Sequence, residues 1–161
     1  MNAQRRKVMA SGILGGLLAR PAAAADCAEG GVGAALLERY VAAVNAHDTS
    51  SFPELFTETY IQHSGRSASG LPAQIENFRR ILSSMPDVQM RVEDRIIAGD
   101  RVVARNTFNA THTQTMQGIA PTGRRFALRT IDIWRVENGK FAEHWDLVDF
   151  PGFVKQLRGE T

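Results

Sequence analysis

Cysteine and metal-binding motifs are nearly absent from this chain of 161 residues. The sole cysteine, Cys27, cannot form an intramolecular disulfide, so the fold must depend on packing. The histidines lack the His-x-His and His-Glu-x-x-His spacings of metal sites, and His144-x-Asp146 would need a third ligand from elsewhere in the chain. A Gly-x-Ser-x-Gly turn and a glycine-rich phosphate loop are also missing. We therefore expect neither a metal nor an organic cofactor.

Long hydrophobic runs are lacking as well. The apolar segment 8–19 is too short, and too rich in glycine and alanine, to span a bilayer. The basic residues 5–7 precede it and small residues 22–25 follow, which is the order of a cleavable export signal. The adjacent arginines Arg5 and Arg6 resemble a twin-arginine signal. We expect residues 1–25 to be removed, residues 26–33 to be a linker, and the protein to be periplasmic or secreted, without a membrane span in its mature form.

An excess of positive charge disappears once the signal is set aside. The whole chain carries a formal net charge of +2. Residues 1–25 hold four basic side chains and no acidic ones, so the mature chain has a net charge of about −2. This balance does not support binding to nucleic acid.

The remaining residues have the length of one domain, and their patterns predict an order of elements. Apolar spacing predicts a helix over residues 34–47, a short helix from Ser51 and a third helix ending near Met85. Alternation and turn signals predict five strands, over residues 60–64, 88–97, 101–113, 126–136 and 140–149. A last helix is predicted over residues 151–158. This order is α+β. A strongly curved sheet around the helices would leave an internal cavity, the natural place for function.

The last strand carries the densest set of reactive side chains. Strict alternation puts Phe141, Glu143, Trp145, Leu147 and Asp149 on one face, which we expect to point toward the cavity because it holds the larger apolar residues. His144 and Asp146 would then face solvent or a partner. A β-bulge in this strand would exchange the two faces.

Several motifs together resemble those of the SnoaL-like polyketide cyclases, or ester cyclases, of the nuclear transport factor 2-like superfamily. They are the segments 60–63, 110–112, 118–124, 133–135 and 139–149, with Gln156-Leu157 in the tail. The resemblance covers about residues 34–158. It implies a cone-shaped α+β barrel with a deep apolar pocket, dimeric through the outer sheet face, that binds a small apolar molecule.

The resemblance also implies a set of site residues. The acid/base aspartate near the end of the last strand would be Asp149, with His63 as its catalytic partner. The expected pocket residues are Tyr60, Phe78, Arg105, His112, Trp134, Glu143 and Trp145. The chemistry of the family would be an intramolecular aldol closure, in which a carboxylate removes a proton next to a carbonyl.

Three functions therefore stay open on the sequence alone. The first is a cofactor-independent acid/base enzyme that cyclises, isomerises or hydrolyses a small apolar carbonyl or ester compound. The second is an exported module that binds such a molecule without catalysis. The third is an interaction protein that uses its open sheet face.

Overall fold

A computed structural model describes residues 31–160, so the predicted signal and most of the predicted linker lie outside the described residues. The elements follow in the order α1 (Gly31–Asn45), α2 (Phe52–Leu55), β1 (Phe56–Gln62), α3 (Leu71–Ser84), β2 (Gln89–Ala98), β3 (Arg101–Thr111), β4 (Arg125–Glu137), β5 (Lys140–Val148) and α4 (Phe150–Arg158). The predicted order of helices and strands is confirmed. Within the described part of the chain, no helix is both long and apolar enough to cross a membrane.

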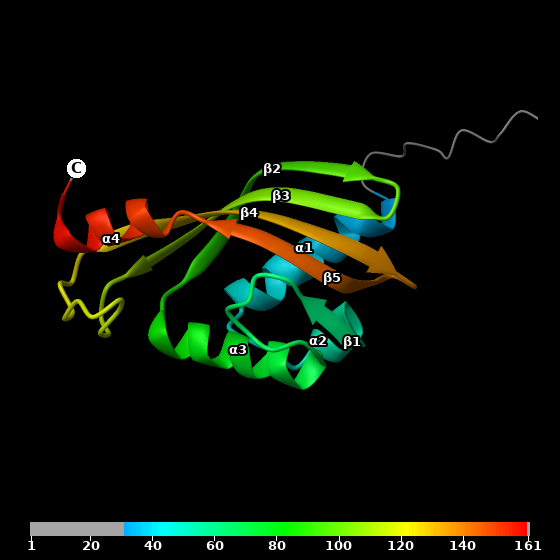
Figure 1. Ribbon diagram of the computed structural model, residues 1–161, viewed down its shortest axis with the longest axis horizontal. Helices are drawn as coiled ribbons and strands as arrows, with labels where there is room; N and C mark the ends of the chain where they lie inside the picture. Colours follow the sequence, from blue (N-terminus) through cyan, green and yellow to red (C-terminus); the bar gives the residue numbers. More distant parts are fainter. Residues whose placement is uncertain (1–30, 161) are drawn as a thin grey trace, which may run out of the picture.

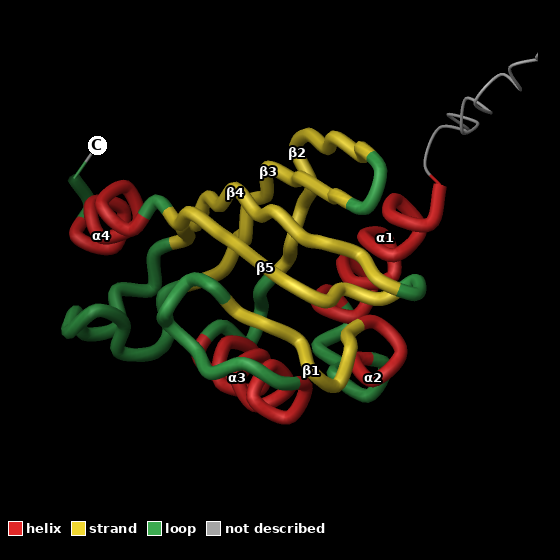
Figure 2. The backbone as a smooth tube through the Cα atoms, turned by 45° about the vertical axis from the view of Figure 1, so that its right-hand side comes forward, coloured by secondary structure: helices red, strands yellow, loops and turns green. Residues whose placement is uncertain are grey.

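The strands form one sheet in the order β1-β5-β4-β3-β2 (Figure 1). β1 runs parallel to β5, and the other neighbours are antiparallel. The helices α1, α2 and α3 lie on one side of this sheet, whereas α4 lies at its far end (Figure 2). The α+β class is confirmed, with a curved sheet that stays unclosed between its edge strands β1 and β2 rather than a complete barrel.

Two apolar clusters fill the space between the sheet and the helices. In the larger one, the ring of Tyr40 packs against Phe52, Phe56, Phe78, Trp134 and Phe141, with ring centroids 5.6 to 6.3 Å apart. The smaller one joins the end of α3 to α4 and includes Met85, Phe126, Phe153 and Leu157. Buried aromatic rings contribute large apolar areas, so these clusters account for much of the packing that replaces disulfides here.

A β-bulge near the start of β5 decides which residues face inward. Arg135 pairs with Glu143, but the next residue, Val136, pairs with Phe141, so Ala142 is an extra residue in β5. Phe141 and Ala142 are therefore both buried, and the alternation restarts one residue later. The prediction from strict alternation is wrong: beyond the bulge, the face that holds His144 and Asp146 points inward.

Candidate active site

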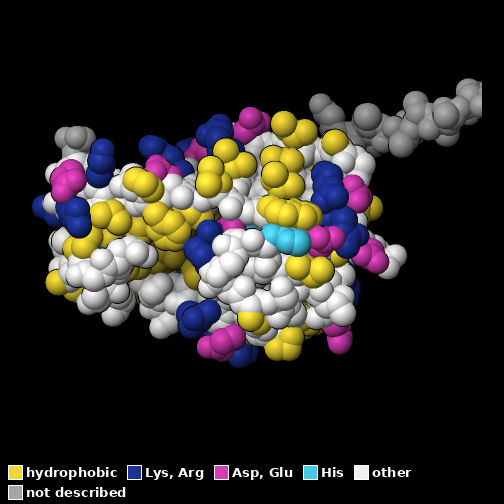
Figure 3. Space-filling view, in the orientation of Figure 1, with side chains coloured by type: hydrophobic (Ala, Val, Ile, Leu, Met, Phe, Trp, Pro, Cys, Tyr) yellow, Lys and Arg dark blue, Asp and Glu magenta, His cyan; other side chains and the backbone are white. Residues whose placement is uncertain are grey.

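Among the described residues, an internal cavity of about 470 Å³ lies between the sheet, α1, α3 and α4. Figure 3 shows hydrophobic side chains gathered in a recess next to α4. Much of the cavity wall is apolar, with the side chains of Phe78, Ile81, Met85, Phe108, Met116, Leu128, Phe150 and Phe153. The sheet wall contributes a compact polar group made of Thr130, Asp132, His144 and Asp146. An apolar cavity with a few convergent polar groups is the usual form of a small-molecule site.

Asp132 on β4 is fully hydrogen-bonded. Its Oδ2 accepts from Asn106 Nδ2 at 2.8 Å and from the hydroxyl of Thr130. Its Oδ1 lies 2.9 Å from Nε2 of His144. The side chain is only 9% exposed, and one donor each from β3, β4 and β5 compensates for its lost hydration. Asp132 is therefore held rigidly as an acceptor behind the cavity wall.

The hydrogen bonds of His144 define its tautomer. Its Nδ1 lies 2.9 Å from Nε2 of Gln62, an amide nitrogen that can only donate. The backbone N–H of Ser64 donates to the side-chain oxygen Oε1 of Gln62 at 3.2 Å, which fixes the orientation of the side-chain amide. His144 Nδ1 is thus an acceptor, and Nε2 carries the proton donated to Asp132. The ring also stacks on Trp134, with centroids 5.0 Å apart and planes 8° from parallel. These contacts lock the imidazole in place.

Asp146 on β5 differs from Asp132 because one of its oxygens is free. Its Oδ2 pairs with Arg66 from the loop between β1 and α3. Its Oδ1 is buried and has no hydrogen-bond partner among the described residues. The side chain is 9% exposed and lines the cavity. The Arg66 guanidinium also lies 5.6 Å from the centre of the Phe150 ring. Asp146 therefore has one buried carboxylate oxygen without a hydrogen bond, in a side chain that lines the cavity.

Tyr40 on α1 lines the same cavity. Burial raises the pKa of its phenol well above the ordinary value, and the negative charges of Asp132 and Asp146 and the neighbouring Tyr60 raise it further. The hydroxyl therefore stays protonated at neutral pH and can donate a hydrogen bond to a bound oxygen atom.

Asp132, His144 and Asp146 bring three potential metal-ligating atoms within 4.8 Å of one another. The structure thus supplies, in Asp132, the third ligand that the spacing of His144-x-Asp146 lacks. Both ring nitrogens of His144 already make hydrogen bonds, to Gln62 and to Asp132. A cation would have to replace one of these bonds, so the observed geometry fits a proton-transfer network better than a metal centre.

Of the residues predicted from the sequence, Phe78 lines the cavity. Tyr60 and Trp134 are buried in the aromatic core behind it. His112 is also buried, at the end of β3, where Nδ1 lies 2.9 Å from the Thr122 hydroxyl. The expectation that Tyr60, Trp134 and His112 line the pocket is wrong.

Three further predicted residues meet on the opposite face of the sheet. His63 stacks on Trp145 with ring centroids 4.3 Å apart, and its Nε2 lies 2.8 Å from Glu143. The Nε of Arg135 donates to Glu143 at 2.6 Å. The hydrogen bond from His63, followed by that from Arg135, lowers the pKa of Glu143. The prediction placed His63, Glu143 and Trp145 at the pocket, on the inner face of the sheet. They lie on the outer face instead, because the bulge turns Glu143 and Trp145 outward.

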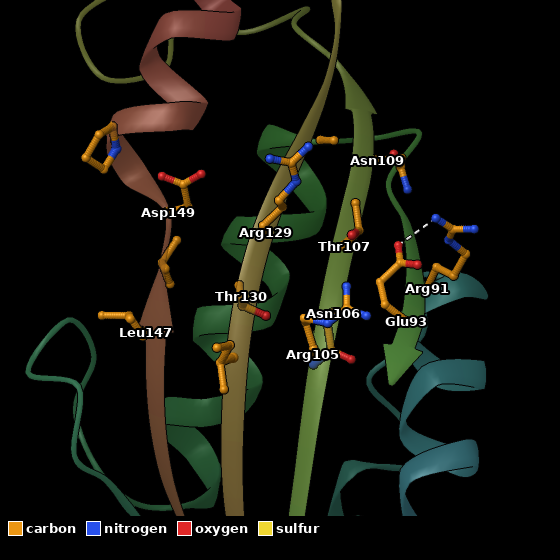
Figure 4. A pocket seen from close by; sticks show the side chains of 14 residues that line it. Arg91, Glu93, Arg105, Asn106, Thr107, Asn109, Arg129, Thr130, Leu147 and Asp149 are labelled. Atoms are coloured by element: carbon orange, nitrogen blue, oxygen red, sulfur yellow. Dashed lines mark hydrogen bonds and ion pairs between the residues drawn. The ribbon is translucent and has the colours of Figure 1, made fainter. Parts of the chain in front are cut away.

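Asp149 and Arg105 line a second, outer hollow of about 580 Å³ (Figure 4). Asp149 lies just beyond β5 and is the N-cap of α4, where its Oδ1 accepts from the backbone N–H of Gly152 at 2.9 Å. This hollow is larger than the internal cavity and shares Thr130 and Val148 with it, but neither Asp132 nor His144 is among its lining residues. The structure thus places Asp149 and Arg105 at the outer hollow and not among the residues that line the internal cavity, and their predicted roles stay predictions.

Sequence reasoning missed Asp132, Asp146 and Tyr40 as site residues. Asp146 was visible in the sequence as a carboxylate three residues before Asp149, but the assumed alternation placed it outside. For Asp132, the available signal was a carboxylate between Ile131 and Ile133 in the middle of a strand, which indicates either a paired core charge or a site.

The curved α+β sheet and the cavity with its buried carboxylates form an arrangement typical of proteins that bind small molecules beside acid/base groups. A family model described as SnoaL-like polyketide cyclase matches residues 34–157, and the chain belongs to this family.

Individual relatives agree with this assignment. The solved structure of TsrD from Streptomyces laurentii is 32% identical, with a TM-score of 0.73 over 81% of this chain and 96% of that chain. A SnoaL-like polyketide cyclase from Agrobacterium tumefaciens is 18% identical and shares the fold, with a TM-score of 0.70 over 78% of this chain and 97% of its own. The nogalonic acid methyl ester cyclase of Streptomyces nogalater is 33% identical over 69 residues, which are 43% of this chain and about half, 49%, of that enzyme.

Proposed function

We propose that this protein is a cofactor-independent acid/base enzyme in which Asp146 removes a proton from a carbon next to a carbonyl group of a small apolar compound. The observation that carries the proposal is the buried, unpartnered Oδ1 of Asp146 in a mostly apolar cavity. Membership of the SnoaL-like polyketide cyclase family supports a cyclase-type reaction, as does the similarity to nogalonic acid methyl ester cyclase.

The reaction that fits is an intramolecular aldol closure. The proton moves from the substrate carbon to Oδ1 of Asp146, and the C–H electron pair forms an enolate with the adjacent carbonyl. The enolate carbon then attacks a second carbonyl of the same molecule, forming a carbon–carbon bond and an alkoxide. The alkoxide takes the proton back from Asp146, so the product is an isomer of the substrate. The cavity holds both reacting ends together, which supplies much of the acceleration.

The neighbouring groups have distinct tasks in this proposal. The phenol of Tyr40 donates a hydrogen bond to the oxygen on which negative charge develops. The chain Gln62–His144–Asp132 holds the wall beside Asp146 in one geometry. Arg66 pairs with Oδ2 of Asp146 and leaves Oδ1 without a hydrogen bond, as a general base requires.

Exchange of α-hydrogens for deuterium in aryl ketones and β-keto esters tests proton abstraction without knowledge of the natural substrate. NMR would follow the exchange in heavy water for the wild type, Asp146→Asn and Asp149→Asn. Loss of a positioned general base lowers the rate by about 10² to 10⁴, so Asp146→Asn should lose nearly all enzyme-dependent exchange. Asp149→Asn is the matched control, because asparagine is an equally good N-cap and Asp149 lies outside the cavity.

Exchange that survives in Asp146→Asn and disappears in Asp149→Asn would overturn the assignment in favour of the residue suggested by the resemblance. Ligand binding without any exchange by the wild type, across the whole panel, would favour a non-catalytic binding module.

We also propose that the protein acts outside the cytoplasm, on the basis of the charged, apolar and small-residue order of residues 1–25. Fractionation of a bacterial host that expresses the full chain should find a shortened protein outside the cytoplasm. Replacement of both Arg5 and Arg6 by lysine should retain the full-length chain inside if export follows the twin-arginine route. Full-length wild-type protein confined to the cytoplasm would contradict export.

A further inference from the structure

The amide of Gln74 is the second unpartnered polar group in the cavity wall. Gln74 and Phe78 are the buried residues of α3, and Gln74 is only 3% exposed. Its Oε1 is buried without a hydrogen-bond partner among the described residues. Exchanging the amide oxygen and nitrogen would bury an unpaired nitrogen instead, so either orientation leaves one polar atom unsatisfied.

An unsatisfied amide is an unfavourable choice for this position. A buried polar group without a partner destabilises a fold, whereas leucine or methionine would fill the same space beside Phe78 without that penalty. Both Gln74 and Phe78 line the internal cavity, one helical turn apart. The free amide therefore meets the contents of the cavity.

Gln74 and Asp146 contribute polar groups to the same cavity from two different elements. Gln74 comes from α3, on the helical side of the cavity, and Asp146 comes from β5 in the sheet (Figure 1). Apolar side chains such as Phe78, Phe108 and Leu128 line the space around them. A ligand that reaches both groups must carry two polar functions joined by an apolar body.

The charges around the cavity favour a neutral ligand. Asp132 and Asp146 both line it, and Arg66 is the one arginine or lysine among its described lining residues. Arg66 is already paired with Asp146. A ligand carboxylate or phosphate would add negative charge next to two carboxylates, which disfavours binding in a poorly solvated cavity.

We propose that Gln74 forms a second polar subsite that selects a neutral substrate hydroxyl, at the end of an apolar body remote from the reacting carbonyl. A hydroxyl both donates and accepts, so it satisfies the free amide in either orientation. The proposal rests on the proposed function, because it takes Asp146 as the site of the carbonyl end. It narrows the substrate class to neutral, hydroxylated, mainly apolar carbonyl compounds.

A binding cycle tests the subsite with two probes, 6-acetyl-2-naphthol and 2-acetylnaphthalene, which differ only in the remote hydroxyl. Fluorescence titration or calorimetry would measure both dissociation constants below neutral pH, where the hydroxyl stays protonated. The wild type should prefer the hydroxylated probe. Gln74→Met should reduce this preference by about tenfold, because methionine neither bonds the probe hydroxyl nor leaves a buried amide unsatisfied when the hydroxyl is missing. The matched control is Glu76→Met on the same helix, at an exposed position that is not among the residues lining the cavity. It should leave the preference unchanged.

An equal preference for the hydroxylated probe in wild type and Gln74→Met would overturn the proposal, since the hydroxyl would then bind elsewhere. Equal affinity of the wild type for both probes would also overturn the proposal, because water would then satisfy the Gln74 amide as well as the probe hydroxyl does. Thermal unfolding of ligand-free Gln74→Met, which we expect to be at least as stable as the wild type, shows that the variant folds. The readout is binding, so it stands apart from the deuterium exchange that tests Asp146: either result can fail while the other holds.

Discussion

At the scale of single residues, the cavity wall combines groups whose proton affinities are shifted by burial and by one another. Tyr40 is the clearest case, because burial, the charge of Asp132 and the neighbouring Tyr60 all raise the pKa of its phenol. The pKa of Tyr60 is raised as well, chiefly by burial and then by Asp132. A phenol that stays protonated is a hydrogen-bond donor at any physiological pH, which suits the role proposed for Tyr40 beside Asp146.

The raised pKa of Tyr40 predicts a loss of stability in alkali. Below pH 10.0, the ordinary phenol pKa, Tyr40 is protonated in both the folded and the unfolded chain. Above it only the unfolded chain releases the proton, so the free energy of unfolding falls by about 1.4 kcal/mol per pH unit for each such phenol. Urea unfolding from neutral pH to about pH 11 should therefore show a shallower decline for Tyr40→Phe than for the wild type.

Tyr60→Phe is the matched comparison for this measurement, because Tyr40 and Tyr60 are the two tyrosines of the chain. It should remove a similar share of the decline. Identical alkaline profiles for the wild type and both variants would show that neither phenol is held protonated by the fold.

At the scale of elements, the extra residue in β5 determines the site. Ala142 is unpaired between Phe141 and Glu143. Odd-numbered residues therefore face inward before it, and even-numbered residues face inward after it. As a result, Asp146 faces the cavity, whereas Trp145 and Leu147 face outward. The outward cluster of His63, Glu143 and Trp145 is a consequence of the same bulge.

Deletion and insertion near Ala142 test this reading of β5. Deletion of Ala142 leaves Phe141, Glu143 and His144 in regular alternation, with His144 and Asp146 still inward. We expect this variant to fold, with a loss of about 1 to 3 kcal/mol from the lost buried methyl group and the altered twist. Insertion of one alanine between Glu143 and His144 would instead turn His144 and Asp146 outward and break their bonds to Asp132 and Arg66.

Circular dichroism, thermal unfolding and deuterium exchange would compare the two variants. The deletion should retain a cooperative transition and exchange activity, and the insertion should lose both. A deletion variant less stable than the insertion variant would contradict the assignment of Ala142 as the extra residue.

The same bulge separates what the sequence could predict from what it could not. The order of elements followed from local periodicity, such as the stripe on α3 and the Asn138-Gly139 turn before β5, so the fold class was accessible. The inward face of β5 was not, because one unpaired alanine carries no distinctive side-chain signal. The bond between Gln62 and His144 depends on β1 lying parallel beside β5, a pairing across 82 residues that local patterns do not encode.

At the scale of the whole molecule, the outer face of the sheet carries apolar side chains that the helices do not cover. Ile96, Ile131, Ile133 and Leu147 are 62, 45, 37 and 71% exposed. The strand register places them on one face, since Ile131 pairs with Leu147, and Ile133 and Ile96 both pair with Val103. Exposed apolar side chains gathered on one face of a folded domain indicate an interaction surface.

We expect this face to join two copies of the chain, as the family resemblance suggests, and Leu147→Arg tests the expectation. Leu147 is the most exposed of the four side chains, so arginine there adds charge to the surface without disturbing the core. Sedimentation and light scattering should find a dimer for the wild type and a monomer for Leu147→Arg, because a buried, unpaired charge weakens an apolar interface by several kcal/mol. The matched control is Val32→Arg, which introduces the same charge at a 65% exposed position on α1 and should remain dimeric. A monomeric wild type, or a Leu147→Arg variant that stays dimeric, would mean that the exposed apolar face has another role. Because Asp146 and Gln74 lie on the cavity side, monomeric Leu147→Arg should still bind the acetylnaphthalene probes, and binding that vanishes with the dimer would show that the second copy completes the cavity.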